Sequence, residues 1–364
     1  MSGHAPADAA PELVCLGESM VTFLPSRPGR LADVPSFTRA IGGAESNVAC
    51  ALAAAGHRVR WVGRVGRDGF GDHLVETIAA HGVDVTAVGR DPHRPTGVYF
   101  RTDDDRATDA HEVVYYRAGS AASAMSPATV PYASVADARI LHLTGITAAL
   151  SADCLALMRE LTAPRPGRPL VSFDVNHRPG LWRDGGAPEV LLELARRADL
   201  VLVGADEAER LWGAADPEAI RAVLGEPAVL VVKLGGDGAV AFERCAAETR
   251  PVPARGSAPD TGVSGVPDTL THAPAPHVTV VSPVGAGDAF AAGFLSGTLR
   301  GLDMRARLRH GHLVAAAALT VPGDIATPPQ RARADRLAAL DTAAWGTLHL
   351  APGWTGDDQE VRTP

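Results

Sequence analysis

Residues 277–299 read HVTVVSPVGAGDAFAAGFLSGTL, and this stretch decides the fold. A β-branched run at 278–281 ends at Ser282-Pro283, and the small and apolar residues around Asp288 recur at helical spacing. The pattern predicts a strand, a tight turn and the N-terminus of a helix. A strand that leads directly into a helix is the building unit of an α/β fold.

The start of that helix has the residues of an anion site. Its first amide groups lack partners within the helix and its dipole is positive there, so the terminus attracts phosphate. Gly285 and Gly287, on either side of Ala286, leave room for a phosphate to approach the backbone. Asp288 then adds a carboxylate where a phosphoryl group would be transferred. This favours a general base that takes a proton from a hydroxyl, and a simple helix cap is the alternative.

The run VGAGDAFAAGF at 284–294 resembles the C-terminal signature of the ribokinase-like (PfkB) carbohydrate kinases. The resemblance implies that Asp288 is the catalytic base, that Gly285, Ala286 and Gly287 form the anion hole, and that ATP and Mg²⁺ are required. It also implies a three-layer α/β/α sandwich with a mostly parallel central sheet and a small β-sheet lid. Members of the family usually have Asp-Thr in place of Ser282-Pro283, so the need for a monovalent cation stays open.

Composition narrows the class of protein. The chain has 364 residues, of which 46% are hydrophobic, and we expect one kinase domain over residues 1–364. The net charge of -8 comes without a basic run, which argues against nucleic acid as a partner. The four cysteines show no C-x-x-C spacing, and no apolar stretch is long enough to cross a membrane. We therefore expect a cytoplasmic protein with buried thiols.

The N-terminal part alternates strands and helices. Residues 13–17 predict a buried strand, and a helix of small residues follows Gly42-Gly43 and ends at Gly56. We expect a strand over 59–65 and a second helix over 71–80. The segment resembles the N-terminal signature of the same family, which implies that Gly42, Gly43 and Asn47 contact the sugar. Local hydrogen bonding near a helix start is the alternative for Asn47.

Residues 96–102 and 111–119 change to a period of two and predict a hairpin. Because they interrupt the strand and helix alternation, we expect a β lid built from about 18–41 and 94–120. Tyr99, Tyr115 and Arg117 would face the substrate from the lid. Cross-strand aromatic pairs and a solvated arginine are the alternative. In this family an exposed lid of this kind also implies a homodimer.

Three segments resemble the 2-keto-3-deoxygluconate kinase branch of the family: YYRAGSAASAMSP at 115–127, LHLTGI at 141–146 and FDVNHRPGLW at 173–182. The resemblance implies phosphorylation of the terminal hydroxyl of this sugar acid to give the 6-phosphate. A sugar acid requires cations, and Arg117 with Arg178 would supply them. Two alternatives stay open: a fructokinase- or ribokinase-like kinase of a neutral sugar, and a nonenzymatic sugar-sensing protein on the same fold.

The C-terminal part predicts a parallel sheet. Apolar strands at 140–143, 170–173 and 200–203 alternate with helices at 153–161 and 188–196. Ligands bind such sheets at the carboxyl ends of the strands. Polar residues and glycines follow three of these ends: Asp174, Asn176 and Arg178; Asp206 and Glu209; and Lys233, Gly235, Gly236 and Gly238.

The resemblance implies roles for these residues. Asn176, Lys233, Gly235, Gly236 and Gly238 would contact the nucleotide, and Glu209 would act indirectly on magnesium through an N-x-x-E element in which Asp206 replaces the Asn. An acidic first helical turn is the alternative for Asp206 and Glu209.

The remaining C-terminal sequence contains a polar insertion, a helix and a loop. Residues 246–276 are rich in Pro, Ala, Ser, Thr and Gly and predict a mobile surface insertion. We expect a helix over 304–319. The following VPGDIATPP at 321–329 resembles the family's closing loop against the adenine side.

Overall fold

The computed structural model describes residues 10–27, 29–102, 112–182, 185–244 and 268–356. Its central sheet has the strand order β14-β13-β12-β11-β10-β9-β1-β4. The pairs from β12 to β4 are all parallel, and β13 and β14 add an antiparallel edge. The strands are β1 (Leu13–Leu16), β4 (Val59–Val62), β9 (Ile140–Thr144), β10 (Leu170–Asp174), β11 (Leu200–Gly204), β12 (Val229–Lys233), β13 (Ala239–Arg244) and β14 (Asp268–Ala273).

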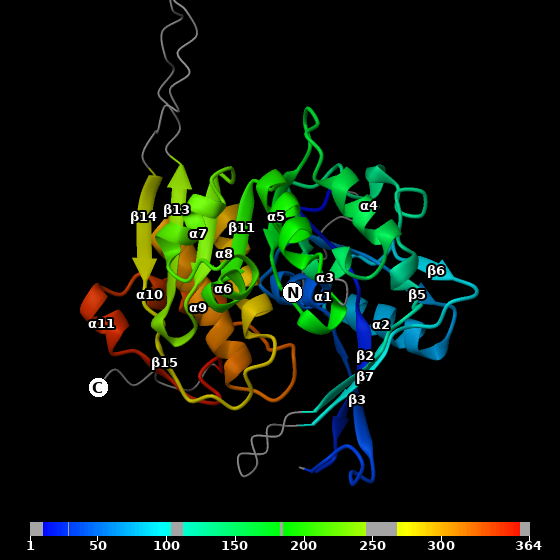
Figure 1. The fold of residues 1–364 in the computed structure, drawn as a ribbon. Helices are drawn as coiled ribbons and strands as arrows, with labels where there is room; N and C mark the ends of the chain where they lie inside the picture. The colour runs from blue at the N-terminus through cyan, green and yellow to red at the C-terminus, as the bar shows by residue number, and fades with distance from the viewer. Residues whose placement is uncertain (1–9, 28, 103–111, 183–184, 245–267, 357–364) are drawn as a thin grey trace, which may run out of the picture.

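Helices cover both faces of this sheet (Figure 1). One face carries α3 (Gly145–Ala148), α4 (Ala152–Leu161), α5 (Ala187–Arg197), α6 (Ala205–Trp212) and α7 (Pro217–Val223); the other carries α1 (Ala44–Ala54), α2 (Gly69–Ala80), α8 (Ala286–Leu299) and α9 (Met304–Leu319). Side chains of one strand alternate between the two cores: in β11, Val201 and Val203 join one cluster and Leu200 and Leu202 the other. The predicted three-layer α/β fold with a mostly parallel sheet is therefore confirmed.

Smaller elements complete the body. Helices α10 (Arg331–Ala338) and α11 (Thr342–Gly346) pack with α9 around a third apolar cluster. The described cysteines, Cys15, Cys50 and Cys154, are free and buried. Within the described ranges, no helix is both long and apolar enough to span a bilayer.

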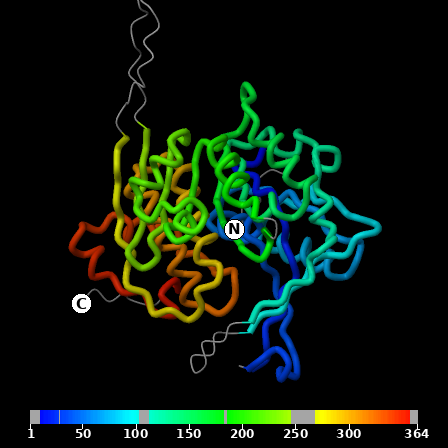
Figure 2. Tube along the Cα trace, viewed as in Figure 1, coloured from blue at the N-terminus to red at the C-terminus, as the bar shows by residue number. Residues whose placement is uncertain are grey.

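A smaller sheet projects from the body (Figures 1 and 2). Its order is β3-β2-β7-β8, and its strands are β2 (Met20–Pro25), β3 (Phe37–Gly42), β7 (Val98–Arg101) and β8 (Val113–Tyr116). We call this four-stranded sheet the lid. Phe23 and Phe100 stack on one of its faces with ring centroids 4.7 Å apart. Strand β8 forms the edge and leaves Val114, Tyr115 and Tyr116 exposed.

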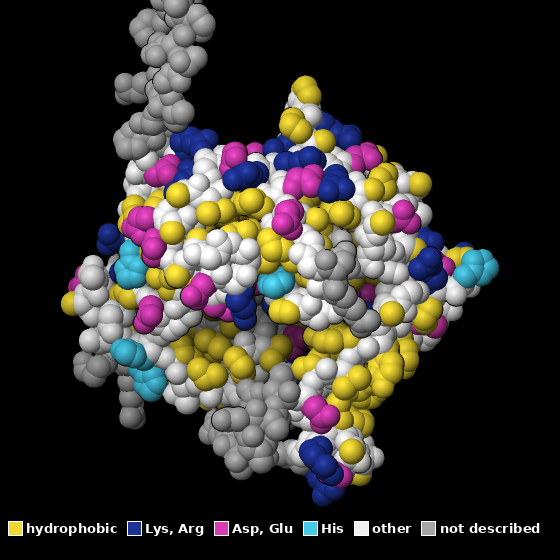
Figure 3. Space-filling model, in the orientation of Figure 1, with side chains coloured by type: hydrophobic (Ala, Val, Ile, Leu, Met, Phe, Trp, Pro, Cys, Tyr) yellow, Lys and Arg dark blue, Asp and Glu magenta, His cyan; other side chains and the backbone are white. Residues whose placement is uncertain are grey.

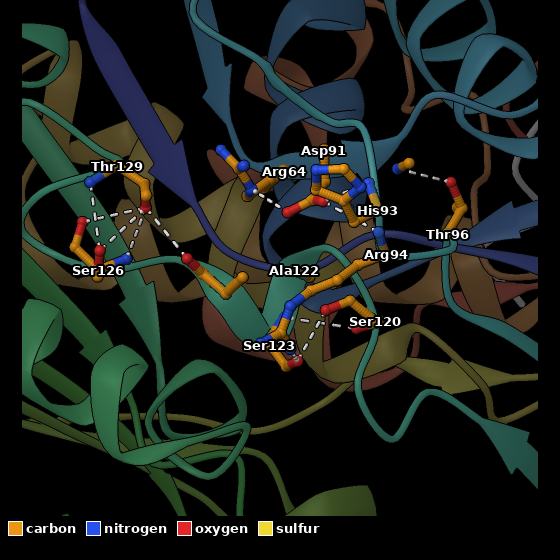
Figure 4. Close-up of polar contacts among 12 residues, drawn as sticks. Arg64, Asp91, His93, Arg94, Thr96, Ser120, Ala122, Ser123, Ser126 and Thr129 are labelled. Atoms are coloured by element: carbon orange, nitrogen blue, oxygen red, sulfur yellow. Dashed lines mark hydrogen bonds and ion pairs between the residues drawn. The ribbon is translucent and has the colours of Figure 1, made fainter.

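Hydrogen bonds fix the segments that enter and leave the β7–β8 hairpin (Figure 4). Arg64 lies 2.9 Å from Asp91, whose other carboxylate oxygen accepts the amide of Arg94 at 3.0 Å. The guanidinium of Arg94 donates to Ser123, beyond β8, at 3.3 Å. The Thr96 hydroxyl, just before β7, accepts a backbone amide at 2.9 Å. The root of the lid is thus tied to the body on both sides.

The expected strand over 59–65 is interrupted at Gly63. Strand β4 ends before it, and β5 (Arg64–Gly66) leaves the central sheet to pair with β6 (Gly89–Asp91). A Cβ atom at Gly63 would lie 2.4 Å from the Trp61 ring and 2.9 Å from the carbonyl oxygen of Gly17. The chain changes sheets at a point where only glycine fits.

The expected strand over 278–281 is wrong for most of its length. Only β15 (His277–Val278) forms, and it pairs with β16 (His349–Leu350) outside the central sheet. Val280 and Val281 are 45% and 43% exposed. β-branched residues favour strands only where a neighbouring strand is available to pair and pack with them, and the backbone here continues toward the start of α8 without one.

The predicted insertion is too long at its C-terminal end. Residues 246–267 lie outside the described ranges, but 268–273 form β14, the edge strand of the central sheet. Arg221 anchors this strand through paired contacts to Asp268 at 2.6 and 2.9 Å. The polar composition of an edge strand resembles that of a loop, because only part of it is buried.

Candidate active site

A cavity of about 570 Å³ lies between the lid and the carboxyl ends of the central strands, and the space-filling view shows the hollow beside the lid (Figure 3). The sequence-predicted residues that line it are Gly42, Gly43, Asn47, Tyr99, Tyr115, Arg117, Asn176, Arg178, Lys233, Gly235, Gly285, Gly287 and Asp288. Segments far apart in the sequence therefore meet here, at the edge where ligands bind parallel sheets.

The N-terminus of α8 opens onto this cavity. Gly285 is the residue before the helix and has a φ of 78°, a conformation that favours glycine. A Cβ atom there would lie 2.5 Å from the carbonyl oxygen of Asp324, whereas one at Gly287 would meet nothing closer than the Lys233 ammonium at 3.9 Å. The turn is tight on its inner side and open toward the cavity, as an anion site requires.

Asp288 is held by two amide side chains. Asn47 of α1 donates to it at 2.9 Å, and Asn176, after β10, donates at 3.5 Å. Burial raises the pKa of Asp288 to about 6, and the charge of Asp174 adds to this, whereas the Asn47 hydrogen bond and the charges of Arg178 and Lys233 oppose it. No side-chain hydrogen bond caps α8. The geometry favours a proton acceptor over a helix cap.

Lys233 is the last residue of β12 and donates to Asp174 of β10 at 2.9 and 3.1 Å. Burial acts to lower the pKa of Lys233, but the charges of Asp174 and Glu207 outweigh it and raise this pKa above the usual value. The ammonium therefore keeps its charge beside the open face of Gly287. A negatively charged ligand at this point would be bound by both a cation and helix amides.

A second cavity of about 440 Å³ adjoins the first. The two share Lys233, Gly235, Pro283 and Gly287 in their walls. The second cavity is mostly apolar, and the predicted residues Gly236, Gly238 and Ala286 line it together with Val278, Val280, Phe290 and His312. Burial lowers the pKa of His312 to about 4, so this imidazole is uncharged at neutral pH. A flat apolar group fits here, next to the anion site.

Two guanidinium groups border the polar cavity. Arg117 forms an ion pair with the buried Glu18, which also accepts the Ser120 hydroxyl at 3.0 Å. Arg178 follows β10, is 53% exposed, and has Glu207 4.0 Å away. Tyr99 and Tyr115 are register partners with ring centroids 5.4 Å apart. The predicted cross-strand aromatic pair and the cavity wall are therefore the same residues.

Glu207 and Glu209 of α6 lie differently relative to the two cavities. This side chain is exposed and lies outside both cavities, whereas Glu207, 8% exposed, lines the polar one. Residues two positions apart on a helix point to nearly opposite sides. Glu207 accepts the backbone amides of His177 at 2.9 Å and Gly204 at 2.8 Å. Asp206 also borders the cavity, in an ion pair with Arg210.

Sequence reasoning missed five charged residues of the polar cavity: Glu18, Arg101, Glu207, Arg210 and Asp324. Glu18 follows the end of β1, so the strand-end rule would have found it. Asp324 lies in the loop that the resemblance placed against adenine, but it lines the polar cavity and not the apolar one. Its carboxylate accepts the Tyr99 hydroxyl at 2.7 Å and lies 3.0 Å from Arg101.

Several buried polar atoms at the polar cavity have no hydrogen-bond partner among the described residues. They are Asn47 Oδ1, Asn176 Oδ1, Arg101 Nε and Arg117 Nε. Buried polar atoms are rarely left unpaired unless a ligand or water completes them. Donors and acceptors spread over one cavity suit a ligand with several hydroxyl and carbonyl groups.

The described residues form no cluster of three or more His, Cys, Asp or Glu side chains fit to hold a metal by themselves. Magnesium takes most of its ligands from phosphate and water and needs only one or two carboxylates. Glu207, at the edge of the polar cavity, fits such a role.

The chain is similar to known carbohydrate kinases in sequence and in fold. The family model described as pfkB family carbohydrate kinase matches residues 10–331. A 2-dehydro-3-deoxygluconokinase of Thermoproteus tenax is 34% identical over 92% of this chain and 96% of its own length. One of Bacillus subtilis strain 168 is 34% identical over 94% and 98%. The crystal structure of a PfkB protein from Polaromonas sp. JS666 superposes with a TM-score of 0.73 at 34% identity, covering 90% of this chain and 99% of that one.

Proposed function

The chain belongs to the pfkB family of carbohydrate kinases, and from this premise we propose that it transfers the γ-phosphoryl group of ATP to the terminal hydroxyl of 2-keto-3-deoxygluconate, giving the 6-phosphate. One observation carries the proposal. Asp288, held by Asn47, lies directly after the open amides of α8, where a polar and an apolar cavity meet. A base and an anion site at one point are what phosphoryl transfer to a hydroxyl needs.

In the proposed complex the adenine occupies the apolar cavity, and Lys233 and the amides of Gly285, Ala286 and Gly287 receive the phosphates. Asp288 takes the proton of the sugar hydroxyl as that oxygen attacks the γ-phosphorus in line. Glu207 would help to hold magnesium, which would supply positive charge against the phosphates. Positioning and charge stabilisation supply most of the catalysis, because the transfer needs little covalent help from the protein.

Recognition of a sugar acid rests on Arg117 and Arg178, which border the polar cavity from the lid and from the loop after β10. A planar carboxylate matches the paired donors of a guanidinium group. The names of the relatives from Thermoproteus tenax and Bacillus subtilis support the same sugar acid. Closure of the lid over the bound sugar would exclude water and limit ATP hydrolysis.

The reaction should have an acid limb set by Asp288. Burial raises the pKa of this carboxyl to about 6, and only the ionised form accepts a proton. We expect kcat/KM for the sugar to fall as pH drops through about 6, tenfold per unit well below it. Steady-state rates between pH 4.5 and 8 check this. A profile flat down to pH 4.5 would contradict a base in this environment.

Glu207 and Glu209 make a matched pair for the magnesium role. Glu207→Gln keeps an acceptor for one backbone amide but removes the charge beside the cavity, so we expect it to raise the Mg²⁺ concentration needed for half-maximal rate at least tenfold. Glu209→Gln, on the outer side of the same helix, should behave as the wild type. Equal responses of the two variants would contradict a specific magnesium role of Glu207.

An ATP-consumption assay with a panel of sugars tests the proposed function. We expect turnover with 2-keto-3-deoxygluconate well above that with fructose or ribose, and the 2-keto-3-deoxygalactonate epimer measures stereochemical selectivity. A preference for fructose or ribose would favour the neutral-sugar kinase. Sugar binding without phosphorylation of any of them would favour the sugar sensor.

Three further properties form part of the proposal. We propose a cytoplasmic homodimer that pairs through the exposed edge of the lid, where Val114, Tyr115 and Tyr116 are 37%, 49% and 65% exposed. Such a contiguous apolar edge favours a partner.

The Ser282 hydroxyl accepts the amide of Val284 at 3.4 Å, at a position where the family usually has a carboxylate. We therefore assign no step of the reaction to a monovalent cation.

A further inference from the structure

A buried charged contact joins strand β7 of the lid to the body. The Arg101 side chain of β7 lies 3.0 Å from the carboxylate of Asp324, and the two side chains are 4% and 5% exposed. Tyr99, on the same strand, donates its hydroxyl to the other oxygen of Asp324 at 2.7 Å. Because water is excluded, this contact is weakly screened and holds the lid strand in one position relative to the loop after α9.

The backbone of Asp324 supports the anion site. A Cβ atom on Gly285 would lie 2.5 Å from the Asp324 carbonyl oxygen and 3.3 Å from its Cα atom, so the two segments are in direct contact. Asp324 therefore faces the lid with its side chain and the first turn of α8 with its main chain. Packed segments of this kind do not deform independently, because interiors are filled to near-crystal density.

The sugar side of the cavity reaches the same contact. A Cβ atom on Gly42 would lie 2.1 Å from the Tyr99 hydroxyl and 2.6 Å from the Asp324 carboxylate. Gly42, Tyr99 and Arg101 all line the polar cavity together with Gly285. A ligand in that cavity thus contacts the lid strand, and the lid strand contacts the residue that supports the phosphate turn.

We propose that the contact between Arg101 and Asp324 couples the lid to the anion site, so that a sugar bound under the lid tightens the binding of ATP. The inference rests on the proposed function and adds a positioning role for Arg101. The sugar holds β7 in the closed position, the ion pair transmits that position to Asp324, and Asp324 fixes Gly285 with its amide toward the phosphate. Coupling of this kind is reciprocal, so ATP tightens sugar binding by the same factor.

The test measures the affinity of a nonhydrolysable ATP analogue by calorimetry, with and without saturating 2-keto-3-deoxygluconate. For the wild type we expect the sugar to lower the dissociation constant at least fivefold, roughly the lower end of typical couplings. In Arg101→Met the ratio should fall to about one, and Arg101→Lys, which keeps the cation, should restore part of it. Arg39→Met, at an exposed position of lid strand β3, should keep the wild-type ratio.

Arg101→Met leaves the Asp324 carboxylate buried without its cation, so loss of folding is a competing explanation. The double variant Arg101→Met/Asp324→Asn removes both charges and should show the same loss of coupling, and a thermal melt of each variant monitors the fold. Wild-type coupling in a folded Arg101→Met or in the double variant overturns the inference, as does an active wild type without coupling. A wild type that phosphorylates no sugar overturns the proposed function instead, and the ATP-consumption assay detects that case separately.

Discussion

Asp288→Asn should lower kcat by about 10²- to 10⁴-fold, the usual contribution of a general base, while ATP and the sugar acid still bind. The asparagine has the shape of the aspartate and keeps an acceptor for Asn47, which donates to residue 288 at 2.9 Å. It cannot take the proton of the attacking hydroxyl. Turnover measured with calorimetric affinities for both substrates separates the two effects.

The same variant has a second, opposite effect on stability. Since burial raises the pKa of Asp288 to about 6, the folded state binds this proton more tightly than the unfolded chain. The ionised carboxylate therefore costs stability, and the cost grows as pH rises from the ordinary aspartate value to about 6 and is then complete. Asp288→Asn should melt at a higher temperature than the wild type at pH 8 and show no gain at pH 4.

Asp153→Asn is the matched control, because Asp153 is an exposed aspartate in the first turn of α4. It should change neither the rate nor the pH dependence of the melting temperature. Near-normal turnover of Asp288→Asn would remove the proposed base, whatever its stability.

Removal of the two cavity arginines, Arg117 and Arg178, should abolish the preference for sugar acids over neutral sugars. A hydrogen bond to a charged group contributes ~1.5–3 kcal/mol, so loss of both guanidinium groups should lower kcat/KM for 2-keto-3-deoxygluconate by about a hundredfold or more. Neutral hexoses make no such ion pair and should lose far less. The comparison needs Arg178→Met combined with Arg117→Met and Glu18→Gln. The last change is needed because Glu18 is 2% exposed and would otherwise be left charged and unpaired.

Arg210→Met is the control for this experiment. Arg210 also lines the polar cavity, but it pairs with Asp206 on its own helix. If only the total positive charge mattered, Arg210→Met would cost as much as each of the other two changes. Equal losses for acids and neutral sugars in the Arg117 and Arg178 variants would point to a fructokinase- or ribokinase-like enzyme.

The local pattern of apolar residues correctly predicted the helices and strands that pack in the interior of the protein. The helices at 304–319 and after Gly42-Gly43, and the strands near 140, 170 and 200, have continuous apolar faces and occur where expected. Residues 278–281 have the same β-branched content, but strand formation depends on a neighbour, and no local signal states that the neighbour is absent.

The candidate site shows the same division. Asp288 and its glycines are adjacent in sequence, so their pattern could be read directly. The pairs that complete the cavity are not local: Glu18 and Arg117 are 99 positions apart, and Tyr99 bonds Asp324 across 225. Whether Glu207 or Glu209 faces the cavity depends on how α6 is rotated about its axis. Helix α6 begins after Gly204, and the composition of the segment does not define that rotation. Contacts that require the fold are invisible to periodicity.

The lid and the body contribute different parts of the cavity: residues of β7 and the segment after β8 come from the lid side, and the phosphate turn and Lys233 come from the ends of the large sheet. Surface strands and loops tolerate change far better than the elements beneath them. Substrate preference can therefore diverge during evolution through replacements in one short hairpin, while the chemistry inherited with the sheet is left untouched. A scaffold with this arrangement can give rise to enzymes for many sugars without reinventing its reaction.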